Sequence, residues 1–295
     1  MQLDPNHLAA LSAVLRLGSF DGAAQALFVT PSAISQRVKA LEEQVGTALV
    51  QRGQPCTGTE MGLRIAKHAE DLGLLEATLL RDIGMARRGP PPRLRVAVNA
   101  DSLATWFVAA MAQADGVLFD LVVDDQDHSA EWLKRGEVSA AVTALEAPVR
   151  GCDMHVLGAL DYRATASPAF MARWFAGGVT PEAIASAPCL TFNAKDQLQR
   201  RWIHTHLGPC PEPPQHFLPS TTAFVEAAEL GVGWGLNPAG LVTEAVVAGR
   251  LVELRPNAGL LTPLSWQVSR LLASALAPVT RAVVKSARQN LIQAT

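Results

Sequence analysis

The sequence lacks the patterns that mark secreted, disulfide-linked or zinc-binding proteins. Its four cysteines are scattered, with no CxxC pair and no histidine at the spacing of a metal ligand. Disulfide frameworks and zinc sites need closely spaced cysteines, so we expect reduced thiols, no bound metal and no cofactor. The N-terminus carries Asp4 early and has no basic segment before an apolar run, which argues against a signal peptide.

Long apolar runs and an excess of one charge are absent as well. No stretch reaches the roughly 18 uncharged apolar residues that a membrane-spanning helix needs, so we expect a cytoplasmic protein with no membrane partner. The formal net charge of −2 provides no global attraction to nucleic acid. A nucleic-acid partner must therefore be recognised by a local surface.

Motifs of common α/β enzymes are also missing. The chain has no G-x-S-x-G motif, no P-loop and no G-x-G-x-x-G loop, and its seven histidines are dispersed. The glycines of "GVGWGLNP" are too regularly spaced for a dinucleotide loop and indicate a strand with a close backbone approach. We expect a protein that is not an enzyme, with an enzyme on the α/β part as the rival interpretation.

The chain length and a proline-rich segment predict two domains of different kinds. A chain of 295 residues has room for roughly two cores. The prolines of "RRGPPPR" (residues 87–93) cannot continue a helix and mark a boundary. Helical segments precede it, whereas apolar runs such as "LRVAV" and "FDLVV" alternate with helical segments after it. This order predicts an α/β domain with mostly parallel strands, and an α/β fold class overall.

Residues 59–88 contain no proline and carry one apolar stripe at steps of three and four, which predicts a single long helix. Packing within its own domain is one interpretation. A helix of about 30 residues between two domains often pairs with a copy of itself, so we expect a homodimer, with a tetramer left open. The residues expected at the dimer interface are Ile65, Leu72, Leu75 and Leu79.

The first 46 residues predict three helices. The first ends near Gly18, the second spans residues 21–27, and Thr30 caps a third with Pro31 in its first position. The third helix has an apolar side and an opposite side of short or flexible hydrogen-bonding residues, which suits a helix that lies in the DNA major groove. The polar residues are Ser32, Ser35, Gln36, Arg37 and Lys39. A solvated helix in an ordinary bundle is the alternative.

The next segment, "LVQRGQPCTGTEMG" (residues 49–62), predicts two short extended pieces around a turn. Such a β-wing would place Arg52, Thr57 and Thr59 against DNA phosphates. The predicted DNA-binding set is Thr30, Pro31, Ser32, Ser35, Gln36, Arg37, Lys39, Arg52 and Thr57.

The stretch "AAQALFVTPSAISQRVKALEEQVGTALVQRG…TEMG" resembles the winged helix-turn-helix of LysR-type transcriptional regulators. It departs from the family pattern at Ala48-Leu49-Val50, where L-F is usual, and at Gly58, where leucine is usual. The resemblance implies a DNA-binding domain (1–59), a linker and dimerisation helix with a Pro-rich hinge (60–92), and an effector-binding domain (93–295). The last would resemble periplasmic binding proteins, with lobe one at about 93–163 plus 264–295, lobe two at about 164–263, and a ligand cleft between them.

The segments "NADSLATW" and "LGALDYRATASPAF" resemble the ArgP/LysG subgroup of that family. This implies control by a basic amino acid (lysine, arginine or histidine) of an amino-acid exporter gene, with operator DNA and RNA polymerase as partners. A nucleoid or replication-origin-binding architectural protein is the alternative. We expect the ligand to close the two lobes.

Residue types in this domain suit such a ligand. Hydroxyls at helix starts attract a carboxylate, and aspartates near strand ends attract cations. Each of them also has a plainer interpretation as a helix cap or a solvated loop charge. The predicted effector-binding set is Asn99, Asp101, Ser102, Asp124, Asp161, Tyr162, Thr221, Thr222 and Asn237, with Asp125 as a further candidate.

Overall fold

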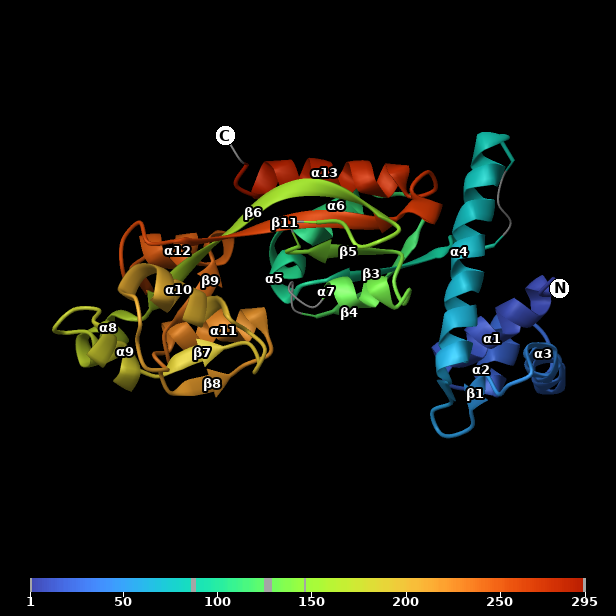
Figure 1. Cartoon of the computed structure of the whole chain (residues 1–295), viewed down its shortest axis with the longest axis horizontal. Helices are drawn as coiled ribbons and strands as arrows, with labels where there is room; N and C mark the ends of the chain where they lie inside the picture. Colours follow the sequence, from blue (N-terminus) through green and yellow to red (C-terminus); the bar gives the residue numbers. More distant parts are fainter. Residues whose placement is uncertain (1, 86–88, 125–128, 146, 294–295) are drawn as a thin grey trace.

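The computed structural model describes residues 2–85, 89–124, 129–145 and 147–293. These residues form three parts arranged in a row: a small helical part, one long helix, and an α/β body drawn out into two lobes (Figure 1). No helix among the described residues is both long enough and apolar enough to cross a membrane.

The N-terminal part is the expected winged helix-turn-helix. Thr30 caps the third helix by accepting the Ala33 N–H at 3.2 Å, and Pro31 follows in the first helical position. Leu11, Ile34 and Leu41 are fully buried where the helices meet. The elements are α1 (Pro5–Leu17), α2 (Phe20–Leu27), α3 (Pro31–Val45), β1 (Val50–Gln51) and β2 (Thr57–Gly58), the two strands being antiparallel.

The long helix α4 (Glu60–Asp82) begins at its cap Thr59, as expected, but ends earlier than predicted. The expectation of helix up to Arg88 was wrong because Gly84 adopts a left-handed backbone (φ +70°) and stops the helix. Residues 86–88 lie outside the described residues. Leu74 of α4 is buried in the core of the α/β body and Leu75 packs against it, so one side of this part of the helix contacts that core.

A mixed sheet forms the first lobe and extends into the second. Its path is β10-β6-β11-β5-β3-β4, with β9 also paired to β6. β3 is parallel to β4 and β5, as the sequence predicted, whereas β6 and β11 are long antiparallel strands that cross from one lobe to the other (Figure 1). The strands are β3 (Arg93–Val98), β4 (Leu118–Val123), β5 (Ala140–Thr143), β6 (Cys152–Ala166) and β11 (Leu260–Ser269).

Helices cover the first lobe, and the C-terminal helix returns to it. The Ser286 hydroxyl on that helix donates to the Trp106 carbonyl oxygen at 2.9 Å. Trp106 and Trp266 are fully buried in the core beneath. The helical elements are α5 (Ala100–Ser102), the π-helical turn η1 (Leu103–Phe107), α6 (Val108–Ala112), α7 (Ser129–Lys134), the 3₁₀ turn η2 (Arg270–Leu272) and α13 (Ala277–Asn290).

The second lobe packs five short helices around short strands. Trp202 and Trp234 are buried at its centre, with ring centroids 5.6 Å apart. Gly235 opens a strand that approaches the Phe224 ring too closely for any side chain, which confirms the strand expected in "GVGWGLNP". The elements are α8 (Pro168–Trp174), α9 (Pro181–Ser186), β7 (Cys189–Thr191), α10 (Leu198–Leu207), β8 (Gln215–Phe217), α11 (Thr221–Glu229), β9 (Gly235–Pro238), α12 (Ala239–Val247) and β10 (Val252–Glu253).

Cys56 and Cys210 are half-buried free thiols, and Cys152 and Cys189 are buried free thiols. Burial raises the pKa of Cys189 to about 11, so this thiol stays protonated and unreactive at neutral pH.

Candidate functional site

Helix α3 presents a polar outer side. Ile34, Val38 and Leu41 are buried against α1 and α2. The opposite side is open to solvent, and the predicted contact residues there are exposed except Arg37, which is half-buried: Thr30, Pro31, Ser32, Ser35, Gln36 and Lys39. The arrangement leaves hydroxyl, amide and ammonium groups available to base edges and phosphates.

The side chain of Lys39 and those of the predicted wing residues Arg52 and Thr57 are exposed to solvent. Lys39 Nζ lies 3.6 Å from Glu43 Oε1, but both side chains are about 70% exposed, so solvent screens the pair. In the wing Arg52 and Thr57 are exposed. The Arg52 guanidinium lies 5.8 Å from the centre of the Phe20 ring, which ties the wing to α2.

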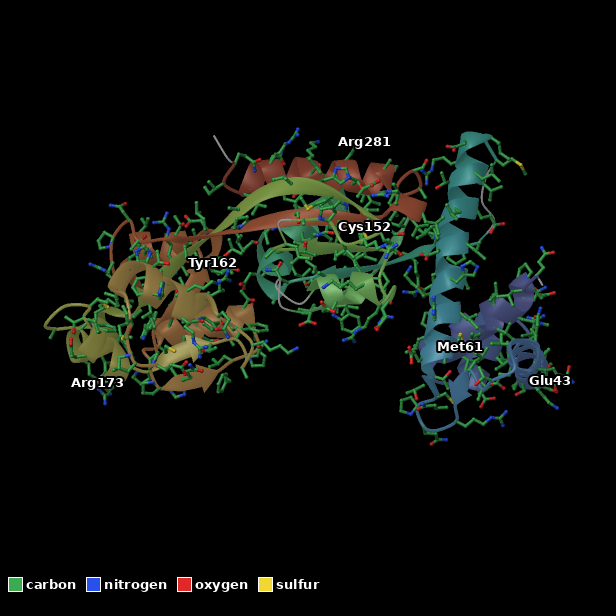
Figure 2. All side chains as sticks on the ribbon, viewed as in Figure 1. Glu43, Met61, Cys152, Tyr162, Arg173 and Arg281 are labelled. Atoms are coloured by element: carbon green, nitrogen blue, oxygen red, sulfur yellow. The ribbon has the colours of Figure 1, made fainter. Side chains whose placement is uncertain are left out.

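A cleft between the two lobes has the Asp101 carboxylate at its centre. The Tyr162 hydroxyl donates to Asp101 Oδ2 at 2.7 Å, and the Thr221 hydroxyl donates to Asp101 Oδ1 at 2.9 Å. Asp101 belongs to α5 of lobe one, Tyr162 to the crossing strand β6, and Thr221 to α11 of lobe two. Figure 2 shows Tyr162 at this junction. Both lobes therefore hold the same carboxylate.

Two more carboxylates line the cleft. Asp124 follows β4 and accepts the Trp132 indole N–H at 2.9 Å. Asp196, in a loop of lobe two, accepts the backbone N–H groups of Phe192 and Leu198 at 3.0 and 2.9 Å. Asp196 could not be singled out from the sequence, because a carboxylate just ahead of a helix is interpreted first as a helix cap. Asp125 lies outside the described residues.

Asn237 and Asn99 complete the polar lining. The Asn237 side-chain amide donates to the Thr165 hydroxyl at 3.0 Å. Its carbonyl oxygen Oδ1 is buried and has no hydrogen-bond partner among the described residues. Asn99 precedes α5 and is buried against the same cleft. A buried amide oxygen without a partner is unfavourable unless a donor reaches it, so Asn237 points to a ligand or a water.

The electrostatics of the cleft favour a cation. Three carboxylates line it, whereas no lysine or arginine occurs in the lining that the structure describes. The open space is about 30 Å³, enough for roughly two water molecules. The described residues that line it are Asn99, Ala100, Asp101, Asp124, Phe192, Asp196, Leu198, Thr221, Phe224, Leu236, Asn237 and Pro238. In the part of the chain described, no three His, Cys, Asp or Glu side chains are placed to hold a metal ion.

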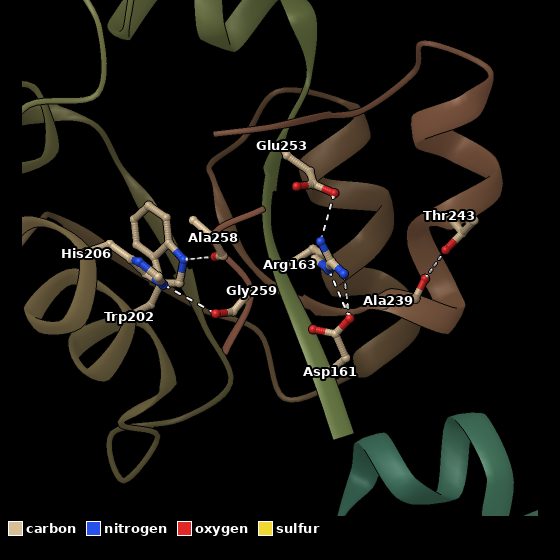
Figure 3. A network of polar contacts seen from close by, with 9 residues as sticks. All are labelled: Asp161, Arg163, Trp202, His206, Ala239, Thr243, Glu253, Ala258 and Gly259. Atoms are coloured by element: carbon tan, nitrogen blue, oxygen red, sulfur yellow. Dashed lines mark hydrogen bonds and ion pairs between the residues drawn. The ribbon is translucent and has the colours of Figure 1, made fainter. Parts of the chain in front are cut away.

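Four of the predicted effector residues are outside the lining of this cleft, although one of them, Tyr162, contacts it through Asp101. Asp161 faces the other side of β6, where its Oδ2 accepts from Arg163 Nη2 at 2.7 Å, and Arg163 also reaches Glu253 (Figure 3). The hydrogen bond that the Arg163 guanidinium donates to the Asp161 carboxylate raises the pKa of Arg163. Ser102 is buried beside the cleft rather than in its lining, and Thr222 is exposed on α11.

A second, larger groove of about 1,020 Å³ lies between α1, α4 and the proline segment 90–92. Leu72, Leu75 and Leu79 line it, and Leu72 and Leu79 are 42% and 59% exposed. Ile65 instead packs against the core of the helix-turn-helix. An exposed leucine stripe along a groove is a surface that another apolar element can cover.

A helix-turn-helix joined through a long helix to a two-lobed domain with a polar cleft defines a class: regulators that bind DNA at one end and a small molecule at the other. Residues 5–63 match the family profile "Bacterial regulatory helix-turn-helix protein, lysR family", and residues 87–292 match "LysR substrate binding domain". The chain therefore belongs to the LysR family of transcriptional regulators.

Individual relatives cover nearly the whole chain. The sequence is 42% identical over 96% of its length to the transcriptional regulator LysG of Mycobacterium bovis, 93% of which is matched. The crystal structure of ArgP from Mycobacterium tuberculosis is 41% identical, with a TM-score of 0.80 over 99% of this chain and 100% of that one. Full-length LysG from Corynebacterium glutamicum with bound effector Arg is 36% identical, with a TM-score of 0.66 over 98% and 99% of the two chains.

Proposed function

We propose that this regulator senses a basic amino acid (lysine, arginine or histidine) in the cleft between its lobes. The observation that carries the proposal is that three carboxylates, those of Asp101, Asp124 and Asp196, line one cleft. Opposite charges attract more strongly in a poorly solvated cleft than in water. The similar LysG structure with bound arginine supports the same ligand class.

The ligand's groups have distinct places in this cleft. Its ammonium and side-chain cation would meet Asp124, Asp196 and the acceptor Oδ1 of Asn237. Its carboxylate would lie near the first turn of α11, which begins at Thr221 and whose N–H groups favour an anion. Asp101 would give up the hydrogen bond that it accepts from Thr221 and accept one from the ligand in its place.

Binding requires movement of the lobes. A space of about 30 Å³ is far below the roughly 300 Å³ of a typical small-molecule site. We propose that the ligand separates the lobes about the crossing strands β6 and β11, in contrast to the closure expected from the sequence. It can shift this equilibrium only by binding the separated form more tightly.

The DNA side of the proposal uses the exposed side of α3 and the wing. Two protomers would pair through the leucine groove beside α4, placing two α3 helices on successive half-sites of an operator. Lobe movement would then change how the pair or tetramer lies on DNA and how it meets RNA polymerase. The proposed target is an amino-acid exporter gene.

An architectural role at the nucleoid or a replication origin is not favoured, because the similar proteins are named transcriptional regulators. Sequence-indifferent, salt-sensitive DNA affinity would be its signature.

The proposal is tested by following the melting temperature during titration with arginine, lysine, histidine and, as a neutral control, norleucine. A ligand at 100 times its Kd stabilises the native state by about 2.7 kcal/mol, which is a shift of several degrees. We expect the shift with at least one basic amino acid, its loss in Asp124→Asn, and its retention in Asp161→Asn, which removes a carboxylate outside the cleft. No shift with any basic amino acid would refute the proposal.

A further inference from the structure

Phe28 combines two unfavourable features at the turn between α2 and α3. Its side chain is 95% exposed, the highest value for a large apolar residue in the part of the chain described. Its backbone is left-handed, with φ +55°. The Phe28 N–H donates to the Gln25 carbonyl at 3.3 Å and the Val29 N–H to that of Ala24 at 3.0 Å, a helix end at which glycine or asparagine is usual.

The Phe28 side chain does not contribute to the packing of the helix-turn-helix core. Leu27 and Val29 on either side pack against the helix-turn-helix core, whereas Phe28 does not. A bulky residue at positive φ is strained, and an aromatic ring left in water gives no hydrophobic stabilisation. Asparagine would suit both the backbone and the solvent better.

Phe28 lies next to the N-terminal end of α3, the proposed recognition helix. Thr30 and Pro31, the cap and first residue of α3, follow after Val29, and the exposed Ser32 and Gln36 occupy the first turns of that helix. The N-terminal end of a recognition helix is the part that approaches the bases. An apolar ring there can pack on the 5-methyl group of thymine, which projects into the major groove.

We propose that Phe28 is a specificity-determining residue that reads a thymine methyl group at the edge of each half-site. This inference rests on the proposed use of α3 as the recognition helix. The strained backbone at Phe28 then has a function, because it holds the ring away from the protein core.

The test begins with an operator that the wild-type protein selects from random duplexes. Each thymine of a half-site is then replaced singly by 2′-deoxyuridine, which removes only the methyl group, and affinity is measured for wild type, Phe28→Leu and Phe28→Asn. We expect one thymine whose replacement weakens wild type by about 3- to 10-fold, weakens Phe28→Leu less, and leaves Phe28→Asn unchanged. Phe28→Asn should also melt about 1–3 °C higher, because asparagine relieves the strain.

The outcomes separate this inference from the proposed function. Selection of an operator without any thymine coupled to Phe28 would overturn the inference and leave the recognition helix in place. Dimer dissociation in Phe28→Asn, measured by sedimentation, would show that the ring meets a second protomer and would also overturn it. Selection of no sequence at all would overturn both proposals.

Discussion

A buried ion pair within the linker helix contacts the effector domain through Ser139, and breaking it should weaken the packing of the helix on that domain. Lys67 Nζ lies 2.5 Å from Asp71 Oδ1, with side chains 9% and 17% exposed. The Ser139 hydroxyl, just ahead of β5, donates to the same oxygen at 3.1 Å. Lys67→Met would leave the Asp71 carboxylate buried, with that hydroxyl as its remaining partner among the described residues.

The expected loss follows from the burial of the pair. Removing one partner of a buried pair costs about 3–5 kcal/mol, and the Ser139 hydroxyl and the remaining exposure of Asp71 reduce this to about 2–3 kcal/mol. Replacing both partners, in Lys67→Met with Asp71→Leu, removes the stranded charge and should recover most of the loss.

Urea unfolding followed by tryptophan fluorescence measures this, because the six tryptophans lie between residues 106 and 266 and report the effector domain alone. A loss of 2–3 kcal/mol should lower the midpoint by about 1 M urea. An unchanged midpoint in Lys67→Met would show that α4 is not part of the effector-domain core and would refute the reasoning.

Further predictions concern α4 and α3. Burial raises the pKa of Glu70 above its usual 4.5, because the charged carboxylate is poorly solvated in the folded state. The folded state is therefore not penalised below pH 4.5, where the group is neutral, and it loses stability as the pH rises through the raised pKa. Glu70→Gln should therefore raise the melting temperature at pH 7 but not at pH 3. Ser35→Ala and Gln36→Ala should each lower the preference for the selected operator over random DNA by about 5-fold or more in competition binding; an unchanged ratio would reject this recognition side. Leu79→Glu, which puts a charge into the leucine groove, should shift sedimentation from dimer to monomer.

The N-terminal part could be predicted from the sequence because its signals are local. The cap at Thr30, the proline after it and the apolar spacing of α3 act within one helix, and the structure confirms each. The end of α4 was missed because the apolar stripe continues to Ile83, whereas the left-handed backbone at Gly84 decides where the helix stops.

The cleft could be predicted only in part, because residues far apart in the sequence build it. Asp101 and Thr221 meet across 120 positions, and both were candidates. Asp161 and Tyr162 were placed in one site, although successive residues of a strand point to opposite faces. That alternation turns Tyr162 toward Asp101 and Asp161 toward Arg163. No local signal distinguishes Asp196 from an ordinary helix cap.

Control of DNA binding by a cleft ligand is most directly tested by operator binding with and without a saturating basic amino acid. Affinity and the length of protected DNA should be measured for the wild type and Asp124→Asn. We predict that the amino acid changes the affinity or the protected length for the wild type and neither for the variant, and that operator DNA changes the ligand affinity by the same factor. Ligand binding that leaves both affinity and protected length unchanged would contradict the account.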